Sequence, residues 1–265
     1  MYYEIDPWGG RAKRINRSME AWLAAADIIF TTAREPHISL FRKKGGRDIR
    51  FIPPTYCQIT FTEAERTPPQ DGVALAYDVV MVGSGLAHWG RVSQLPGAVQ
   101  RATLVRRLQR EPNLRVAIYG GGWSGRGAMG LLPHGEQPAA IRQGLISVNW
   151  DHYPQHESYA SDRLPISMLA GRAHVTTAHP RFDWLPSEET GLFLAPTVPA
   201  VLRRIEEIMA TPVEDILALG AAAHRWVKGR LSHREAARFM LAAIDTHLLD
   251  GLPEPWIGFA RDWPN

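Results

Sequence analysis

The hydrophobic positions in the first part of the chain alternate between helical spacing and short continuous runs. One helix is indicated by apolar residues three or four positions apart, namely Met19, Trp22, Leu23 and Ala26. Ser18 precedes them as a candidate N-cap. Apolar runs at residues 27–33 and 48–54 predict strands. Residues 35–46 between them predict a second helix, with Pro36 in its first turn.

The same alternation restarts after residues 62–72, a polar and proline-rich stretch that we interpret as a linker. Further strands are predicted by apolar runs at residues 77–84, 114–122, 144–150, 172–178 and 190–195. Further helices are predicted at residues 96–111, 162–171, 198–211, 213–230 and 233–249. Gly171 stands where a helix C′ glycine is expected. Strands that alternate with helices predict an α/β fold with mostly parallel sheets, covered on both faces.

Two Rossmann-like domains account for this order of elements. Residues 1–70 hold too few elements for a complete domain, so we expect the N-terminal domain to be incomplete. Residues 71–245 hold nearly all the elements of a second domain. We expect residues 246–265 to form a tail that packs back toward the N-terminal domain.

Composition and targeting signals narrow the class of protein only a little. The 265 residues are 45% hydrophobic, which is ordinary for a globular protein. No apolar run approaches the ~20 residues of a membrane span, and the first residues lack the profile of a signal peptide. Cys57 is the only cysteine, so no intrachain disulfide is expected. We therefore expect a cytoplasmic protein with no membrane partner.

The basic residues gather in three clusters, and the net charge is +3. The clusters are Arg11, Lys13, Arg14 and Arg17; Arg42, Lys43, Lys44, Arg47 and Arg50; and Arg101, Arg106, Arg107 and Arg110. They are either solvated faces or surfaces that attract a polyanion, such as nucleic acid or a sugar nucleotide. Charge alone does not separate these alternatives.

Several familiar catalytic motifs are missing. The chain has no His-Glu-x-x-His, no Gly-Lys-Ser/Thr phosphate loop and no Gly-x-Ser-x-Gly elbow. It also has no Asp-x-Asp pair, which one architecture for sugar transfer uses to bind its metal. The ten histidines lack the spacing of metal ligands, so no metal site is expected.

The carboxyl ends of four predicted strands hold residues suited to an anionic ligand. These ends are residues 83–85, 120–123, 149–151 and 176–177. Ligands of open α/β sheets bind beyond the carboxyl ends of the strands, so these segments should line one crevice. Glycines at these positions let backbone N–H groups approach a diphosphate. His88 occupies the third glycine position of a dinucleotide fingerprint, which argues against a nicotinamide dehydrogenase.

A family resemblance is visible in the same region. The stretch RATLVRRLQREPNLRVAIYGGGW, residues 101–123, resembles the Arg-x-x-Leu-x-x-x-Leu and Gly-x-Gly-Trp pattern of the CgeB-like (spore-maturation) glycosyltransferases of the GT-B superfamily. The strand ending in Asn149, the helix with Arg163 and the last helix, RLSHREAARFML, are similar to that family as well. The match spans about residues 75–245.

The opening residues YYEIDPWGG resemble a late strand of the family's N-terminal domain. The resemblance therefore implies that the chain starts partway through this domain, with several opening units missing. Strand edges left exposed in this way would need a cover, for which we expect a homodimer.

The resemblance implies a GT-B-like enzyme that moves a sugar from a nucleoside diphosphate, such as a UDP-sugar, to an acceptor hydroxyl held by the N-terminal domain. It implies no metal and no cofactor other than this donor substrate. The implied donor-binding residues are Ser84, Gly85, Gly122, Trp123, Asn149, Asp162, Glu188 and Glu189. Arg163 would stabilise the leaving diphosphate, and Asp6 or His88 would act as the general base.

One position departs from the family pattern. Related GT-B enzymes often have a glutamate that accepts both ribose hydroxyl protons, and Ile166 stands at that position here. Asp162 or Glu188 would have to substitute, or the donor would bind weakly. The departure, together with the shortened N-terminal domain, is also consistent with a catalytically inactive module that binds a nucleotide or a partner.

The acceptor and the individual site residues are open to more than one interpretation. The acceptor is either a hydroxymethylated pyrimidine in DNA, which the basic clusters favour, or a protein or glycan. Plainer roles for the site residues are a turn at Asp6, loop packing at His88, an ion pair of Arg163 with Glu157 or Asp162, a strand-end hydrogen bond at Asn149, and a solvated loop at Glu188 and Glu189.

Overall fold

The computed structural model describes most of the chain, as two α/β units in contact with each other. The described residues are 1–4, 15–67, 75–85, 88–89, 92–93, 95–182, 184–186 and 188–245. Asp6 and the proposed tail, residues 246–265, lie outside them, as does the side chain of His88. Within the described residues, no helix combines the length and the apolar character needed to span a bilayer.

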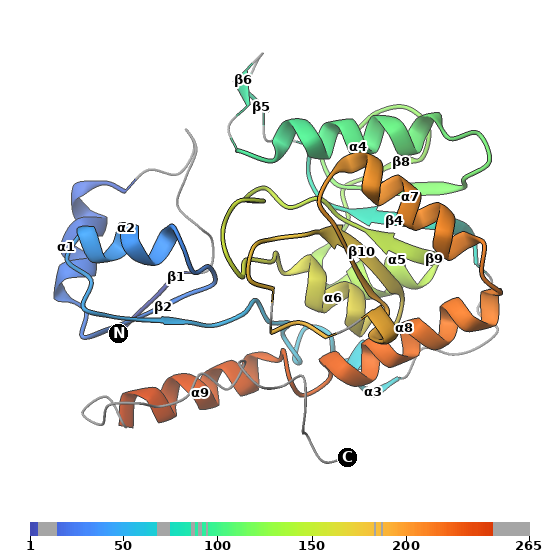
Figure 1. Cartoon of the computed structure of the whole chain (residues 1–265). Coiled ribbons are helices and arrows are strands. Elements are labelled where there is room, and N and C mark those ends of the chain that lie inside the picture. Colours follow the sequence, from blue (N-terminus) through green and yellow to red (C-terminus); the bar gives the residue numbers. More distant parts are fainter. Residues whose placement is uncertain are drawn as a thin grey trace.

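The N-terminal unit is a three-stranded parallel sheet with two helices, as Figure 1 shows on its left side. The strands follow the order β1 (Tyr2–Glu4), β2 (Ile28–Thr31) and β3 (Asp48–Phe51). The helices are α1 (Arg17–Ala25) and α2 (His37–Lys43). Buried side chains of α1, α2 and β2 form a small core of their own, namely Met19, Leu23, Ala26, Ile29 and Phe41. The predicted order of strands and helices is confirmed.

Two local predictions for α1 were wrong. The N-cap is Asn16, whose side-chain oxygen accepts a hydrogen bond from the Met19 amide at 2.9 Å, and Ser18 lies inside the helix. Trp22 is 64% exposed, whereas Met19 and Leu23 are buried. The apolar face is therefore narrower than the spacing of large residues suggests.

The C-terminal unit is built around a six-stranded parallel sheet in the order β11-β10-β9-β4-β7-β8. These strands are β4 (Tyr77–Val82), β7 (Val116–Tyr119), β8 (Ala128–Gly130), β9 (Gly144–Val148), β10 (Ala173–Thr177) and β11 (Leu192–Ala195). A small antiparallel pair, β5 (His88–Trp89) and β6 (Val92–Ser93), follows β4 in the chain. The central strands are buried on both faces, as expected for a parallel sheet between helical layers.

Helices cover both faces of this sheet (Figure 1). On one face, α4 (Ala98–Arg110) packs against β7, and α7 (Val198–Met209) packs against β10 and β11. On the other face lie α5 (Gln137–Arg142), α6 (Arg163–Leu169) and α8 (Val213–Val227). Two short 3-10 helices, η1 (His134–Glu136) and η2 (Glu188–Thr190), precede α5 and β11. The predicted α/β class with mostly parallel sheets is confirmed.

The described part of the segment that we interpreted as a linker is helical. Residues Thr62–Arg66 form a short helix, α3, which is held against the C-terminal unit. The Arg142 guanidinium donates to the carbonyl oxygens of Ala64 and Thr67 at 3.2 and 2.8 Å, and His224 lies 3.1 Å from the Ala64 oxygen. These contacts come from distant residues, which explains why a local reading of polar residues and prolines missed them.

The last described helix, α9 (His233–Asp245), returns to the N-terminal sheet. Phe239 packs edge-on against Phe30, with ring centroids 6.1 Å apart. Just before α9, the chain forms a parallel bridge between Tyr56 and Ser232. One apolar core therefore runs from α6 and α8 to β2 and α9, and it joins the two units.

The contact between α9 and the sheet should contribute measurably to stability. We expect Phe239→Ala to lower the free energy of unfolding by about 3 kcal/mol, because it removes a buried ring and leaves a cavity. Urea unfolding followed by circular dichroism measures this change. Leu241→Ala on the same helix is the control: Leu241 is 62% exposed, so we expect less than about 0.5 kcal/mol. Equal losses for the two variants would show that α9 does not pack as described.

Candidate functional site

The four strand ends that we expected to meet are neighbours in the sheet. Strands β10, β9, β4 and β7 are consecutive and parallel, so the residues that follow them gather at one edge. Ser84, Gly85, Gly122, Trp123 and Asn149 all follow one of these strands. This edge is the place where open α/β sheets bind their ligands.

The loops after β4 and β7 lie in direct contact because glycines leave room. The Gly85 amide donates to the Gly121 carbonyl oxygen at 2.8 Å, and the Trp123 indole N–H donates to the Gly83 carbonyl oxygen. Gly120 has a φ of +130°, and a Cβ there would lie 2.3 Å from the Gly83 oxygen. A Cβ at Gly85 would lie 2.9 Å from the Trp123 ring. The Gly-rich pattern is therefore needed for loop packing as well as for any ligand.

Arg101 ties the β4 loop to the loop that follows β9. It is only 1% exposed. Its Nε donates to the Trp150 carbonyl oxygen at 2.7 Å, and its Nη1 lies 2.6 Å from His152 Nε2. Longer contacts reach the Ser84 carbonyl oxygen at 3.5 Å and Asn149 Oδ1 at 3.4 Å. Because a guanidinium group has only donors, His152 Nε2 accepts.

The sequence analysis grouped Arg101 with the solvated or polyanion-attracting arginines. The structure instead places it on the apolar face of α4, at helical spacing from Leu104, Val105 and Leu108, which are all buried. Periodicity was the signal that could have identified it. Arg106, Arg107 and Arg110 lie on the exposed face of the same helix.

Arg163, at the first position of α6, brings a second guanidinium group to Gly83. A Cβ at Gly83 would lie 3.3 Å from Arg163 Nε and 3.6 Å from Arg101 Nη1. Arg163 Nε is buried and has no hydrogen-bond partner among the described residues. Burial, together with the charge of Arg163, lowers the pKa of Arg101. The two guanidinium groups repel each other and are partly shielded from water. An anion bound between them would therefore stabilise both charges.

Of the two carboxylates considered as ion-pair partners of Arg163, only Asp162 lies within reach of it. Its Nη1 lies 3.5 Å from Asp162 Oδ1, at the long end of a contact with a half-exposed carboxylate. Glu157 pairs with Arg181 at 3.6 Å instead. Neither carboxylate contacts the buried Nε of Arg163.

A buried carboxylate fixes the end of β9. Asp151 accepts from the Asn149 amide group at 2.7 Å, and its other oxygen lies 3.1 Å from His179 Nε2. Its own backbone amide donates to Thr177 at the end of β10. Burial alone would raise the pKa of Asp151, but the hydrogen bond and charge of His179 outweigh it and hold this pKa below its ordinary range. Asn149 is thus bonded at both ends of its side chain, to Asp151 and to Arg101.

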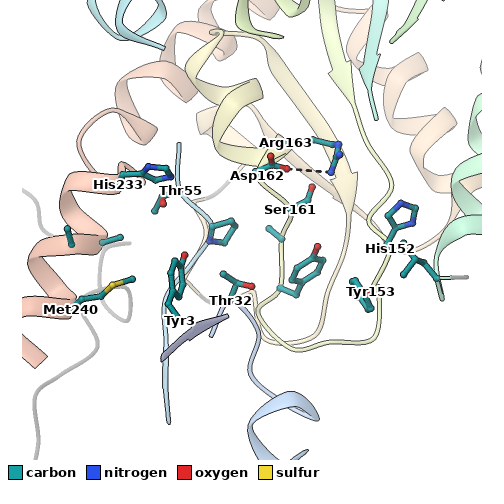
Figure 2. A pocket seen from close by; sticks show the side chains of 16 residues that line it. Tyr3, Thr32, Thr55, His152, Tyr153, Ser161, Asp162, Arg163, His233 and Met240 are labelled. Atoms are coloured by element: carbon teal, nitrogen blue, oxygen red, sulfur yellow. Dashed lines mark hydrogen bonds and ion pairs between the residues drawn. The ribbon is translucent and has the colours of Figure 1, made fainter. Parts of the chain in front are cut away.

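The edge of the sheet opens onto a cavity of about 800 Å³ between the two units. Figure 2 shows Tyr3, Thr32 and Thr55 from the N-terminal unit with His233 and Met240 of α9 around this cavity. Further lining residues come from the segment between β9 and α6, namely His152, Tyr153, Tyr159, Ser161, Asp162 and Arg163. Arg163 therefore faces the N-terminal unit across this cavity.

Glu188 and Glu189 are not brought to this cleft. They form η2 at the amino end of β11, and Glu188 pairs with Arg204 at 2.9 Å. Both line a separate hollow of about 310 Å³ with Phe193. Ile166 is 1% exposed within the apolar core, so α6 presents no carboxylate at that position.

The α/β fold of the chain is similar to that of solved GT-B glycosyltransferases, and the predicted fold class is confirmed. Sucrose-phosphate synthase from Thermosynechococcus elongatus superposes with a TM-score of 0.59 and 16% identity over 88% of this chain and 61% of that one. A trehalose-6-phosphate synthase superposes with a TM-score of 0.60 and 8% identity over 92% and 67%. The chain thus spans less than two thirds of the synthase from Thermosynechococcus.

Two further structures share this fold and hold a ligand. HepE from Anabaena, in complex with UDP and glucose, has a TM-score of 0.57 and 11% identity over 88% of this chain and 68% of that one. The T4 phage protein BGT, in complex with UDP-glucose, has a TM-score of 0.55 and 11% identity over 82% and 62%. No protein-family model and no curated sequence matches the chain. Membership of the CgeB-like family stays a prediction.

The buried pair of Asp151 and His179 predicts a pH dependence of stability. The folded-state pKa of Asp151 is depressed, so its contribution is present above the unfolded value of about 3.9 and is lost as the pH falls through the folded value. We expect Asp151→Asn to cost about 3 kcal/mol at pH 7, and the difference from the unmodified chain to shrink as the pH falls below about 4. Urea unfolding over this pH range measures both effects.

Asp162→Asn is the matched control for this substitution. Asp162 is half-exposed and makes only a long contact with Arg163, so its loss should change stability by less than about 0.5 kcal/mol at any pH. A difference for Asp151→Asn that stays constant down to pH 3 would contradict the ion pair.

Proposed function

We propose that the chain is a nucleotide-sugar-dependent glycosyltransferase, and that it binds the diphosphate of its donor beside Gly83, between Arg101 and Arg163. The observation that carries this proposal is the buried Nε of Arg163, which has no hydrogen-bond partner among the described residues and lies next to a second guanidinium group. Guanidinium groups suit phosphate oxygens in charge and in geometry. The place, beyond the carboxyl end of β4, is where such folds bind nucleotides.

The structural neighbours support the choice of donor. Two of them hold UDP with glucose, or UDP-glucose, and both share the fold of this chain. We therefore propose a UDP-sugar as the donor and membership of the CgeB-like glycosyltransferases. We also propose that transfer needs no metal, because the two guanidinium groups would compensate the charge of the diphosphate, and that it takes place in the cytoplasm.

The mechanism that follows is charge stabilisation of the leaving group. As the bond between the sugar and the diphosphate breaks, negative charge develops on the phosphate oxygen. Arg163 would donate to that oxygen through its free Nε–H, and Arg101 would supply a fixed positive charge that its own hydrogen bonds hold in place. Asp6 and His88 remain our proposed general bases.

The proposed donor contacts follow the same edge of the sheet. Ser84, Gly85, Gly122 and Trp123 form the loops beside the paired arginines, and Asp162 lines the cleft. Asn149 would act through Arg101, since both ends of its side chain are bonded. Glu188 and Glu189 are not part of this proposal, because η2 lies at the opposite end of β11.

A second candidate function is a catalytically inactive module that binds a nucleotide or a partner. The observation that favours it is Ile166, which lies in the apolar core where related enzymes often have a ribose-binding glutamate. For the enzyme, we propose an acceptor among three classes: DNA with a hydroxymethylated pyrimidine, which the exposed arginines of α4 favour, a protein, or a glycan. We also propose a homodimer.

Removal of the Arg163 side chain should weaken donor binding. We expect Arg163→Ala to raise the dissociation constant for UDP about 10- to 100-fold, because a hydrogen bond to a charged group contributes about 1.5–3 kcal/mol. Isothermal titration calorimetry measures this constant. Arg181→Ala, which removes an exposed arginine paired with Glu157, should leave the affinity unchanged.

Unchanged UDP affinity of Arg163→Ala would rule out the proposed diphosphate site. UDP binding by the unmodified chain, with no hydrolysis or transfer from any of a panel of UDP-, GDP- and TDP-sugars, would favour the inactive module over the enzyme.

A further inference from the structure

The cavity between the two units has a charged side and an uncharged side. Among its described lining residues, the two side chains with a full charge are Asp162 and Arg163, both at the start of α6. The described residues on the opposite side are neutral and come from the N-terminal unit and α9: Tyr3, Thr32, Pro54, Thr55, His233, Ala236, Ala237 and Met240. Figure 2 shows the two sides facing each other across the cavity.

The titratable groups on this opposite side are uncharged at neutral pH. Burial raises the pKa of Tyr3 to about 12, so its hydroxyl keeps its proton. Burial also lowers the pKa of His233, so its imidazole is neutral. The wall therefore offers hydroxyl groups and an imidazole as neutral hydrogen-bonding partners, with Pro54 and Met240 as apolar surface.

The described residues of this wall offer no charged partner to an anion. A phosphate group placed against them would lose water without gaining a cation from them, which is unfavourable. A hydroxyl-bearing ring would instead exchange hydrogen bonds with neutral groups and cover apolar surface. Apolar lining with a few placed polar groups is typical of small-molecule sites, and about 800 Å³ is within their usual size.

We propose that the acceptor of the transfer is an uncharged, hydroxyl-bearing ring compound, of the class of neutral saccharides and glycosides, bound against Tyr3, Pro54 and Met240. The inference rests on the proposed glycosyltransferase function, and it selects among the acceptor classes left open above. The phosphate backbone of DNA is disfavoured by this wall, although exposed arginines of α4 would attract it elsewhere on the surface.

The bonds, electrons and proton of the proposed glycosyl transfer can all be accounted for. The acceptor oxygen forms a bond to the anomeric carbon of the donor while the bond from that carbon to the phosphate oxygen breaks. The electron pair of the broken bond stays on the nucleoside diphosphate, beside Arg163. The acceptor proton passes to the proposed general base, Asp6 or His88, so no oxidant, reductant or further reactant is needed.

The first test compares matched ligands in binding, with the proposed diphosphate site saturated by UDP. We expect nitrophenyl glucoside to bind at least tenfold more tightly than the same glucoside with a phosphate group, as measured by calorimetry. Tighter binding of the phosphorylated compound, or binding of neither, would overturn the proposal. With UDP-glucose as the donor, we expect faster turnover of nitrophenyl glucoside than of its phosphorylated form. Faster turnover of an oligonucleotide with hydroxymethylcytosine than of nitrophenyl glucoside would also overturn the proposal.

The second test places a charge in the wall. We expect Met240→Lys to lower the affinity for nitrophenyl glucoside at least tenfold and to leave the affinity for UDP unchanged. Leu241→Lys is the control, because Leu241 is the exposed neighbour of Met240 and does not line the cavity. Unchanged glucoside affinity of Met240→Lys would overturn the proposal.

If the unmodified chain does not bind UDP, the proposed function is contradicted, and not the proposed acceptor class. The glucoside titrations need no sugar transfer, so they judge the acceptor wall separately from the donor site.

Discussion

The buried guanidinium group of Arg101 is the interaction on which the candidate site depends. It joins a carbonyl of the β4 loop to a carbonyl, an amide and an imidazole that follow β9. An arginine with its hydrogen bonds satisfied on so many sides cannot move without unpairing several buried groups at once. The two loops are therefore held in one arrangement before any ligand arrives. That preorganisation is what a site for a leaving diphosphate requires, since donors that are already oriented need no rearrangement as charge develops.

The second constraint is the chemistry of a cleft with two unlike sides. The start of α6 provides the charged side chains of Asp162 and Arg163, while the described residues of the N-terminal unit and α9 provide neutral hydroxyl groups and apolar surface. A charged donor and an uncharged acceptor would each meet the surface that suits them. The position of the two substrates would then follow from electrostatics and desolvation, with few contacts that have to be specific.

The sequence predicted those features that depend on local periodicity and failed where distant residues decide. Apolar runs identified the strands of both sheets except β1, which the family resemblance indicated, and β8, which was not predicted; the four strand ends meet as expected. The N-cap of α1 was misplaced because Ser18 and Asn16 are both good caps, and only backbone geometry selects between them. Arg101 was not predicted to be buried, because we grouped it with other arginines by its charge and did not consider its position on the apolar face of α4. Glu188 was placed near the donor by the family resemblance, whereas its position directly before β11 puts it at the amino end of that strand. The helix α3 depends on contacts with Arg142 and His224, which lie far away in the chain.

The bridge between Tyr56 and Ser232 has a consequence for motion. The chain passes between the two units twice within the described residues, before α3 and before α9, and both passages meet at this bridge. The Tyr56 amide donates to Leu231 at 2.8 Å, and the His233 amide donates to Tyr56 at 2.9 Å. Two segments bonded side by side resist shear and separation. The units are also bonded away from this bridge, since the Arg34 amide donates to the Glu157 carbonyl oxygen at 2.9 Å and the Glu157 amide donates to the Glu35 carbonyl oxygen at 2.8 Å. Rotation about the bridge alone would break these bonds, so the two sides of the cleft are held in one register.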